Sequence, residues 1–411
     1  MSQISFQFRQ MAQRMWFLPA AFSLGAIVTI LIAYYGARYA PAADKLPFTV
    51  PSNGVVSILT ILASSLLTVS VFALSTMVSA LASASQSTTP RAVPLIVGDR
   101  SAQTSISIFI GAFLFSVVGI IGLSSGIYSE AGRLLLFAVT IVVVVLVIAA
   151  LIRWIGQISA IGRVTETIDR VEAATTRAFD ALSNRQLFGC SVLRGEPSGV
   201  PLVADKIGYV QHIDVSKLQR VADEHELQIA IVSRPGAYAA PNWPLMVVMG
   251  EVDDETRERL ANAFVIGDSR TFESDPRYGL ITLSEIAGKA LSPGINDPGT
   301  AIDVIGTLVR ILAAHREDDG PRAVKYVRLS VAALEPAELL EDAFRSIARD
   351  GAASIEVVLR LLAGLETIAA GEPEYAEVAL VTARDAAERA RVALTAKSDL
   401  AALERAAAFA R

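Results

Sequence analysis

Long stretches without a single acidic or basic residue constrain this chain more than any other feature. Residues 46–90, 101–129 and 134–152 contain no Asp, Glu, Lys, Arg or His. A further uncharged apolar stretch covers the 20 residues from Trp16 to Tyr35. About 20 apolar residues in a helix cross the hydrocarbon core of a bilayer. The sequence therefore predicts four membrane spans, at about residues 16–35, 55–81, 104–123 and 134–152.

The first apolar stretch has a second interpretation, a cleaved signal peptide. Arg9 and Arg14 precede it, and basic residues also precede the apolar core of a signal peptide. That core has about 7–15 residues, whereas this stretch has 20. Trp16 and Tyr35 stand at its two ends, where aromatic side chains favour the bilayer interface. A membrane span is therefore the favoured interpretation.

Charged residues return at an ordinary density after Arg153. Over the whole chain they make up 19%, against about 25% in soluble proteins, so the deficit belongs to the first part. The fold class predicted is an α-helical integral membrane protein with a mostly helical α+β cytosolic domain that contains a small β module. The predicted parts are a transmembrane domain (1–154), a helical stalk (155–190), the β-rich module (191–252) and a helical cytosolic domain (253–411).

Patterns within these parts predict individual elements. A helix over residues 156–185 continues from the fourth span, and a helix over 215–226 has Asp214 as its candidate N-cap. The expected strands are 199–202, 207–213, 228–232 and 244–249. The expected helices after them are 253–264, 281–290, 298–315, 336–349, 353–369, 374–395 and 397–409.

The distribution of Lys and Arg between the loops predicts the orientation of the spans. Loops on the cytosolic side of a membrane protein carry an excess of these residues. One set of loops carries six Lys or Arg residues and the opposite set carries three. We therefore predict a protein of the bacterial inner membrane whose termini and large domain lie in the cytosol. The first set is Arg9, Arg14, Arg91, Arg100, Arg153 and Arg163, and the second is Arg38, Lys45 and Arg133.

Several classes of function are disfavoured by what the sequence contains. The net charge of −5 offers no basic surface for nucleic acid. Cys190 is the only cysteine, which excludes an intrachain disulfide and a cysteine zinc cluster. No nucleophile elbow, phosphate-binding glycine loop or zinc motif is present. We therefore expect no enzymatic activity, no cofactor and no bound metal.

The second predicted span carries hydroxyl side chains along one side. They recur mostly three or four residues apart, which places them on one stripe of a helix. Small hydroxyl residues are typical of close helix packing in membranes, and this is one interpretation. The other is a wetted face that lines a pore in an oligomer. The stripe consists of Ser57, Thr60, Ser64, Thr68, Ser75, Ser79 and Ser83.

The interior of the membrane domain bears on the choice among functions. Coupled transporters commonly place an ionisable residue at the midplane, and the predicted spans contain none. A homo-oligomeric ion channel or pore with a cytosolic regulatory domain is therefore the favoured function. The alternatives are a membrane-anchored sensor or scaffold that conducts nothing, and a secondary transporter. Three glycines of the third span, Gly111, Gly119 and Gly122, are predicted to be helix-packing positions.

Two further segments contain candidate site residues. Arg91 and Arg100 flank the loop between the second and third spans, where they either anchor the topology or bind lipid phosphates. Asp297 and Pro298 suit the start of a helix, as N-cap and first residue. The second interpretation of that segment is a loop for an ion or a small ligand, with Ser292, Asn296 and Asp297 as its polar groups.

Two blocks of sequence carry a resemblance to a known family. The first is Ser85–Gln103 with Phe109–Phe113, and the second is Asp275–Leu280 with Ala290–Ala301. They resemble a family of predicted bacterial membrane proteins catalogued as domain of unknown function 2254, from the first span to about residue 315. The loop in the first block is less basic here than is usual in the family. The resemblance implies a membrane location and this architecture, and it supplies no reaction and no catalytic residues.

Overall fold

The structure is a computed structural model that describes residues 16–39, 51–97, 100–158, 163–182, 187–314, 324–371 and 373–411. Its contacts divide the described residues into two compact units. The apolar unit holds those up to Ser85 and those from Val93 to Arg163. The polar unit holds Gln86–Ala92 and the residues from Val164 onward. Arg9, Arg14, Lys45 and His315 lie outside the described residues.

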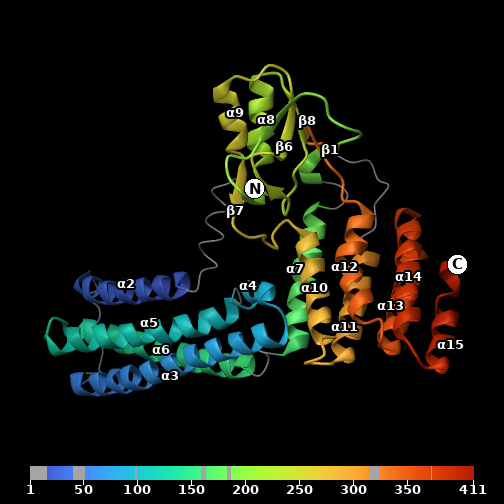
Figure 1. The fold of residues 1–411 in the computed structure, drawn as a ribbon. Helices are drawn as coiled ribbons and strands as arrows, with labels where there is room; N and C mark the ends of the chain where they lie inside the picture. The colour runs from blue at the N-terminus through green and yellow to red at the C-terminus, as the bar shows by residue number, and fades with distance from the viewer. Residues whose placement is uncertain are drawn as a thin grey trace. The chain divides into compact units, whose positions relative to one another are not determined.

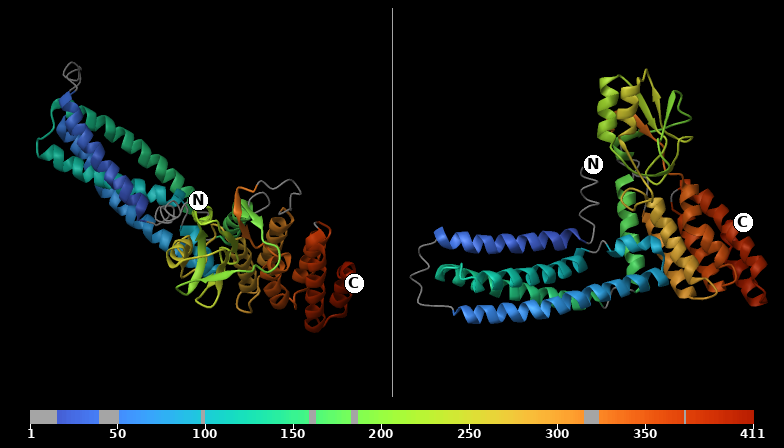
Figure 2. Two further views of the ribbon diagram at one scale, coloured as in Figure 1. Left: turned by 90° about the horizontal axis from the view of Figure 1, so that it is seen from above. Right: turned by 60° about the vertical axis from the view of Figure 1, so that its left-hand side comes forward.

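The apolar unit is built from long helices that lie side by side (Figures 1 and 2). Among the described residues, three helices are long and apolar enough to cross a membrane, and they lie at the places of the second, third and fourth predicted spans. At the place of the first predicted span the apolar part of the helix, Phe17–Ile32, is shorter. The helices are α2 (Phe17–Tyr39), α3 (Ser52–Ser87), α5 (Arg100–Ser124) and α6 (Glu130–Ile158), with the short α4 (Val93–Val97) before α5.

Glycines of α5 bring the helices of this unit close together. A Cβ atom at Gly111 would lie 3.2 Å from Cβ of Phe22 on α2 and 3.3 Å from its carbonyl oxygen. At Gly119 it would lie 3.1 Å from Leu59 of α3, and at Gly122 it would meet the ring of Tyr128. Small residues let helix backbones approach closely in membranes, so the predicted helix-packing role is confirmed for Gly111 and Gly119, whereas Gly122 meets Tyr128 in the loop after α5.

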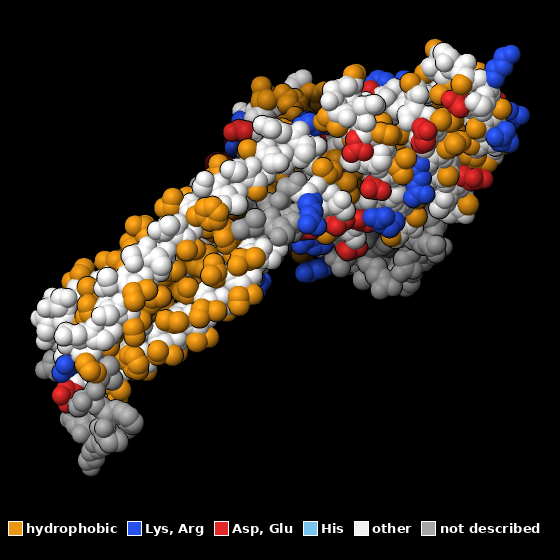
Figure 3. All heavy atoms as spheres, turned by 90° about the horizontal axis from the view of Figure 1, so that it is seen from below, with side chains coloured by type: hydrophobic (Ala, Val, Ile, Leu, Met, Phe, Trp, Pro, Cys, Tyr) orange, Lys and Arg blue, Asp and Glu red, His pale blue; other side chains and the backbone are white. Residues whose placement is uncertain are grey.

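The surfaces of the two units differ in composition. Hydrophobic side chains cover much of the visible face of the apolar unit, whereas Lys, Arg, Asp and Glu are spread over the polar unit (Figure 3). Among the exposed residues of α6 are Val142, Val145 and Ile148. Soluble proteins rarely expose large continuous apolar patches, so a bilayer is the solvent that suits this surface.

After Gln86–Ala92, the polar unit continues with α7 (Val164–Leu182), the helix expected as a stalk. The preceding helix, α6, ends at Ile158, and Arg163 is not helical. The single helix predicted across residues 156–185 is therefore wrong and is replaced by two helices. Buried Val171, Ala174 and Phe179 hold α7 against the rest of the unit.

Two small sheets form the β-rich part of the polar unit. The five-stranded sheet has the order β1-β8-β4-β6-β2, in which β8 runs parallel to β1 and β4, and β6 antiparallel to β4 and β2. The three-stranded sheet is antiparallel, in the order β5-β3-β7. The strands are β1 (Cys190–Val192), β2 (Val200–Val203), β3 (Gly208–Ile213), β4 (Gln228–Ile231), β5 (Tyr238–Ala239), β6 (Pro244–Met249), β7 (Phe264–Gly267) and β8 (Tyr326–Val331).

Two helices accompany the sheets, α8 (Val215–Glu224) and α9 (Asp254–Ala261). Asp214 caps α8 as predicted, because its side chain accepts a hydrogen bond from the backbone N–H of Lys217 at 3.0 Å. The helix predicted over residues 253–264 is too long, since α9 ends at Ala261 and the chain continues into β7. The strands β7 and β8 fall outside the range predicted for the β module.

A bundle of helices completes the polar unit. The predicted helices of this region are present, and α10 begins five residues earlier than expected because Asp275 caps it and Pro276 takes its first turn. Phe344, Ile347, Leu361 and Leu365 are among its fully buried side chains. The helices are α10 (Pro276–Ala290), α11 (Pro298–Ala314), α12 (Pro336–Asp350), α13 (Ile355–Ala369), α14 (Pro373–Ala393) and α15 (Lys397–Ala406).

Candidate functional site

All seven predicted residues of the hydroxyl stripe are exposed on α3. Six residues on the other side of the same helix are buried, and all of them except Ala84 pack into two apolar clusters with side chains of α5 and α6. At 3.6 residues per turn, the two sets project to opposite sides of the helix. The stripe therefore faces away from the packing surface that α3 uses within its own chain. The buried set is Val55, Leu59, Leu66, Ala73, Met77 and Ala84.

Hydroxyl groups of the stripe donate to carbonyl oxygens of their own helix. Thr60 Oγ1 donates to the carbonyl of Val56 at 2.8 Å, and Ser64 Oγ to that of Thr60 at 3.0 Å. Such bonds satisfy the one donor of each hydroxyl group, and its oxygen keeps lone pairs that accept further bonds. The arrangement is stable in an apolar surrounding and also suits contact with water or a cation. Ser57 and Thr68 make the same type of bond.

The segment that follows α3 in the chain is held by the polar unit. Thr88, Thr89 and Ala92 of this segment are buried. Thr89 Oγ1 donates to Oε2 of Glu285 on α10 at 3.1 Å, and the guanidinium of Arg91 pairs with Oε1 of the same carboxylate. A short helical turn, η2 (Pro90–Ala92), shapes the segment. We call Gln86–Ala92, which includes the last two residues of α3, the connector.

Arg91 and Arg100 are the two residues predicted to be topology anchors or lipid ligands. Arg91 pairs with Glu285 in the structure, with 47% of its side chain exposed. Arg100 begins α5, and its side chain lies outside the described residues. Their roles toward lipid remain predictions.

The contacts at the start of α10 account for the residue types at Asp275–Leu280, the first part of the second block that resembles the family. Asp275 accepts hydrogen bonds from the backbone N–H of Tyr278 at 3.1 Å and from Arg270 at 2.7 and 2.9 Å. The Asp275 side chain is only 4% exposed. Gly236, with φ of 89°, lies directly against the Asp275 carboxylate, which leaves no room for a side chain. Asp275 therefore joins the turn after β4 to the first turn of α10.

A second group of charges ties α10 to α12 and to the same turn. Arg277 pairs with Asp342 at 2.6 Å and with Glu338 at 2.7 Å, and Arg234 reaches Glu338 at 3.0 Å. Burial lowers the pKa of Arg234, and the Glu338 carboxylate opposes that shift. Partial burial also disfavours ionised Arg277, but Asp342 and Glu338 outweigh it and raise its pKa. These groups are paired, which indicates a structural role.

The segment between α10 and α11 has the predicted cap. Asp297 accepts from the backbone N–H of Thr300 at 3.1 Å and from its hydroxyl at 2.6 Å. The hydroxyl of Thr300, followed by its N–H, lowers the pKa of Asp297. Ser292 Oγ donates to the Lys289 carbonyl at 2.6 Å, and Asn296 takes a φ of 50°. The structure thus accounts for these residues by local geometry, and binding of an ion or ligand by Ser292, Asn296 and Asp297 remains a prediction.

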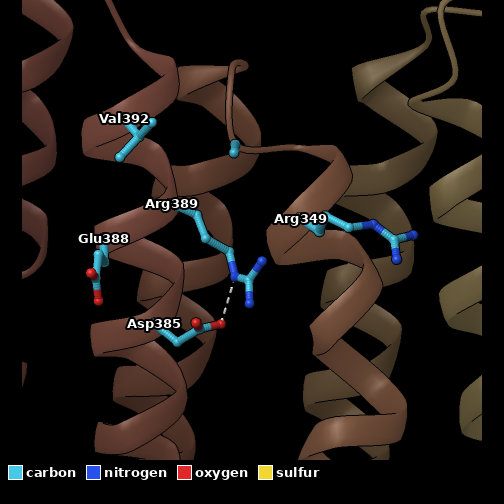
Figure 4. Close-up of a pocket in the computed structure, with 6 residues that line it drawn as sticks. Arg349, Asp385, Glu388, Arg389 and Val392 are labelled. Atoms are coloured by element: carbon cyan, nitrogen blue, oxygen red, sulfur yellow. Dashed lines mark hydrogen bonds and ion pairs between the residues drawn. The ribbon is translucent and has the colours of Figure 1, made fainter.

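An open hollow of about 460 Å³ lies on the bundle beside α14 (Figure 4). Arg349, Arg389, Asp385 and Glu388 supply its charges. Arg389 pairs with Asp385 at 2.7 Å, and Arg349 with Asp350 at 2.7 Å. Within the described part of the chain, no group of three or more His, Cys, Asp or Glu side chains is placed to hold a metal ion.

Glu285 is the residue that the sequence reasoning missed. It is the only acidic residue in α10, whose side chains are otherwise mostly apolar and buried. An isolated carboxylate on such a helix is a signal for a specific partner, but the partner itself, Arg91, lies 194 residues away in the chain. Nothing in the sequence connects the two.

Three apolar helices of membrane-spanning length, together with the exposed apolar surface, define a membrane protein. The chain belongs to the DUF2254 family, described as predicted membrane proteins, with a match over residues 12–367. This confirms the resemblance seen in its sequence.

Relatives of the chain occur in mycobacteria. The uncharacterized protein Rv1290c of Mycobacterium tuberculosis and the uncharacterized protein Mb1321c of Mycobacterium bovis are each 26% identical to it over 308 residues. The match covers 71% of this chain and 58% of each relative, so the chain spans less than two thirds of their length. No solved structure matches the chain.

Proposed function

We propose that the chain forms a homo-oligomeric pore for ions in a bacterial inner membrane, with α3 lining the conduit and the polar unit regulating it. The observation that carries this proposal is the exposure of the whole hydroxyl stripe on the side of α3 opposite its buried face. Helix packing within one chain does not use the stripe. Assembly of several copies around the stripe would bring hydroxyl oxygens together along one axis, where they replace part of the hydration of an ion.

The topology proposed with this function has four spans and both termini in the cytosol. α2 packs on α5 through Gly111, and Ile30 joins the same buried cluster as Leu59 and Phe115. A helix that packs into the core of the apolar unit is expected to lie in the same bilayer as the other helices. This supports α2 as a membrane span, the first of the four in the chain. Reporter fusions after residues 45, 98 and 129 test the orientation: only the fusions after 45 and 129 should report the outer side.

Substitution of the stripe tests the pore. Purified protein in planar bilayers should conduct, and Ser64→Leu with Thr68→Leu should abolish or strongly alter the conductance because leucine offers no oxygen to an ion. Thr29→Leu on α2 is the matched control, since Thr29 Oγ1 also donates to a carbonyl four residues earlier, that of Gly25, at 2.8 Å. A monomeric particle in native mass spectrometry, or wild-type protein without ion flux, contradicts the proposal.

The two alternatives give different results in the same experiments. A membrane-anchored sensor or scaffold should show no conductance and should tolerate the leucine substitutions. A secondary transporter should show saturable uptake of a particular substrate in liposomes. The absence of ionisable residues from the described parts of the helix cores of α3, α5 and α6 favours the pore over a proton-coupled transporter.

A further inference from the structure

Two segments of the polar unit that join it to the rest of the chain both contact α10. The connector, Gln86–Ala92, reaches α10 through Glu285. The stalk helix α7 packs on α10 where Gly279 lies directly against Thr175. Since α3 runs without interruption to Ser87, the first of these contacts lies immediately after the helix with the hydroxyl stripe.

The same helix is also joined to the sheets and to the rest of the bundle. Asp275 at its start holds Arg270 and lies against Gly236 in the turn after β4. Arg277, in its first turn, pairs with Asp342 of α12. A movement of the start of α10 would therefore also move Glu285, because the turns from Arg277 to Glu285 form one continuous helix whose inner face is buried.

The contact at Glu285 differs from the contacts at the start of α10 in its exposure. The side chains of Arg91 and Glu285 are 47% and 36% exposed, whereas that of Asp275 is 4% exposed. Ion pairs in contact with water contribute little net free energy and are screened by salt. One carboxylate also holds both Thr89 and Arg91, so loss of its negative charge breaks the ion pair with Arg91 and weakens the hydrogen bond from Thr89.

We propose that Glu285 is a reversible latch on the connector, through which the polar unit controls the cytosolic end of α3. The latch is closed when the Glu285 carboxylate holds Thr89 and Arg91, and open when these contacts are broken while α10 stays folded. This inference rests on the proposed pore for its consequence, since control of α3 is control of the conduit. The latch itself is a structural claim that is measurable without conduction.

Hydrogen–deuterium exchange of the full chain in lipid nanodiscs tests the latch. The backbone N–H of Ala92 donates to the Thr89 carbonyl at 3.1 Å and that of Arg91 to Thr89 Oγ1 at 3.3 Å, so these groups report on the connector. Glu285→Gln should speed their exchange about threefold to tenfold, the size expected for one weak charge-assisted contact. The double variant Arg91→Glu with Glu285→Arg should bring exchange part of the way back to the wild-type rate, because it restores the ion pair while arginine at residue 285 cannot accept from Thr89 Oγ1.

A matched control separates the latch from a general loss of charge pairing. Glu341 pairs with Arg345 within α12, with both side chains more than half exposed. Glu341→Gln should leave exchange of the connector unchanged. Unchanged exchange in Glu285→Gln, or an equal increase in Glu341→Gln, overturns the latch.

Conductance then distinguishes the latch from the pore. In a conducting wild-type protein, Glu285→Gln should change open probability without changing the unitary conductance. If the connector opens but open probability stays the same, the proposed control of α3 is wrong. If wild-type protein never conducts while exchange responds as expected, the pore is wrong and the latch on the connector stands.

Discussion

Gly279 of α10 lies directly against Thr175 of α7, with no space for a Cβ atom between the two helices. Thr175 is fully buried, and its hydroxyl donates to the Val171 carbonyl at 2.6 Å, so it cannot turn away without losing that bond. Gly279→Ala should therefore destabilise the polar unit by about 1–3 kcal/mol, the usual cost of overpacking a core. Thermal unfolding of the full chain followed by circular dichroism measures the change.

Gly288, on the same helix, provides the control for that substitution. A Cβ atom there would lie 3.3 Å from a carboxylate oxygen of Asp350, the end of a side chain that is able to move. Gly288→Ala should leave the free energy of unfolding unchanged or raise it slightly. Alanine is a better helix former than glycine by about 1 kcal/mol, which offsets the close contact with Asp350. Equal effects of the two substitutions would show that α7 and α10 do not pack as described.

The contact between α2 and α5 yields a second prediction. Gly111→Val places side-chain atoms against the backbone of Phe22, whose carbonyl carbon and oxygen would lie within 3.4 Å of a Cβ atom at residue 111. We expect α2 to separate from α5 and the melting temperature in nanodiscs to fall by several degrees. Gly25→Val on α2 is the control, because nothing lies within 4 Å of a Cβ atom there. The prediction fails if the two variants have the same melting temperature.

The ion pair between Arg270 and Asp275 yields a third. Asp275→Asn keeps a side chain that can cap α10 but leaves the mostly buried Arg270 without its counter-charge. Removing one member of a buried pair costs about 3–5 kcal/mol. Chemical denaturation of the full chain should show a decrease in the free energy of unfolding near the lower end of this range, since the Arg270 side chain is 19% exposed. Asp385→Asn, which breaks the exposed pair with Arg389, should cost about 1 kcal/mol or less.

Local patterns in the sequence predicted much of the helical structure. Uncharged stretches gave α3, α5 and α6, and Asp214 was correctly placed as the cap of α8 because capping depends on neighbouring residues. β6 was predicted with its observed bounds, Pro244–Met249. β8 was missed, since it lies between β1 and β4 in the sheet and its partners are more than 90 residues away in the chain.

The candidate site was predictable only in part for the same reason. The hydroxyl stripe is a periodic pattern of one helix, and its place on α3 followed from spacing alone. Which side of α3 is buried depends on α5 and α6, and spacing does not give that. The pairing of Arg91 with Glu285 depends on a contact between residues 194 apart. Single-sequence patterns contain no information on such a contact.

Burial of Cys190 in β1 leads to a fourth prediction. Burial raises the pKa of its thiol to about 12. Only the thiolate reacts with alkylating agents, and an ordinary cysteine has a pKa of about 8.5. At pH 8 the native protein should therefore react with iodoacetamide about a thousandfold more slowly than the unfolded chain. Mass spectrometry of the intact protein, with and without urea, measures both rates. Rapid labelling of native protein would contradict the burial of β1.

The cap of α11 yields the last prediction, on pH. Hydrogen bonds from Thr300 lower the pKa of Asp297 in the folded chain, so the unfolded chain binds a proton more readily, at its ordinary pKa of about 3.9. The stabilisation is therefore present above about pH 4 and is lost as the pH falls through the folded pKa. Asp297→Ala should reduce stability at pH 7 by about 1 kcal/mol and should flatten this part of the acid unfolding curve. Thr300→Val should also flatten the curve, since the hydrogen bond from the Thr300 hydroxyl is the largest single cause of the lowered pKa. If Asp297 instead binds a cation, its substitution should remove a salt-specific stabilisation that Thr300→Val leaves in place.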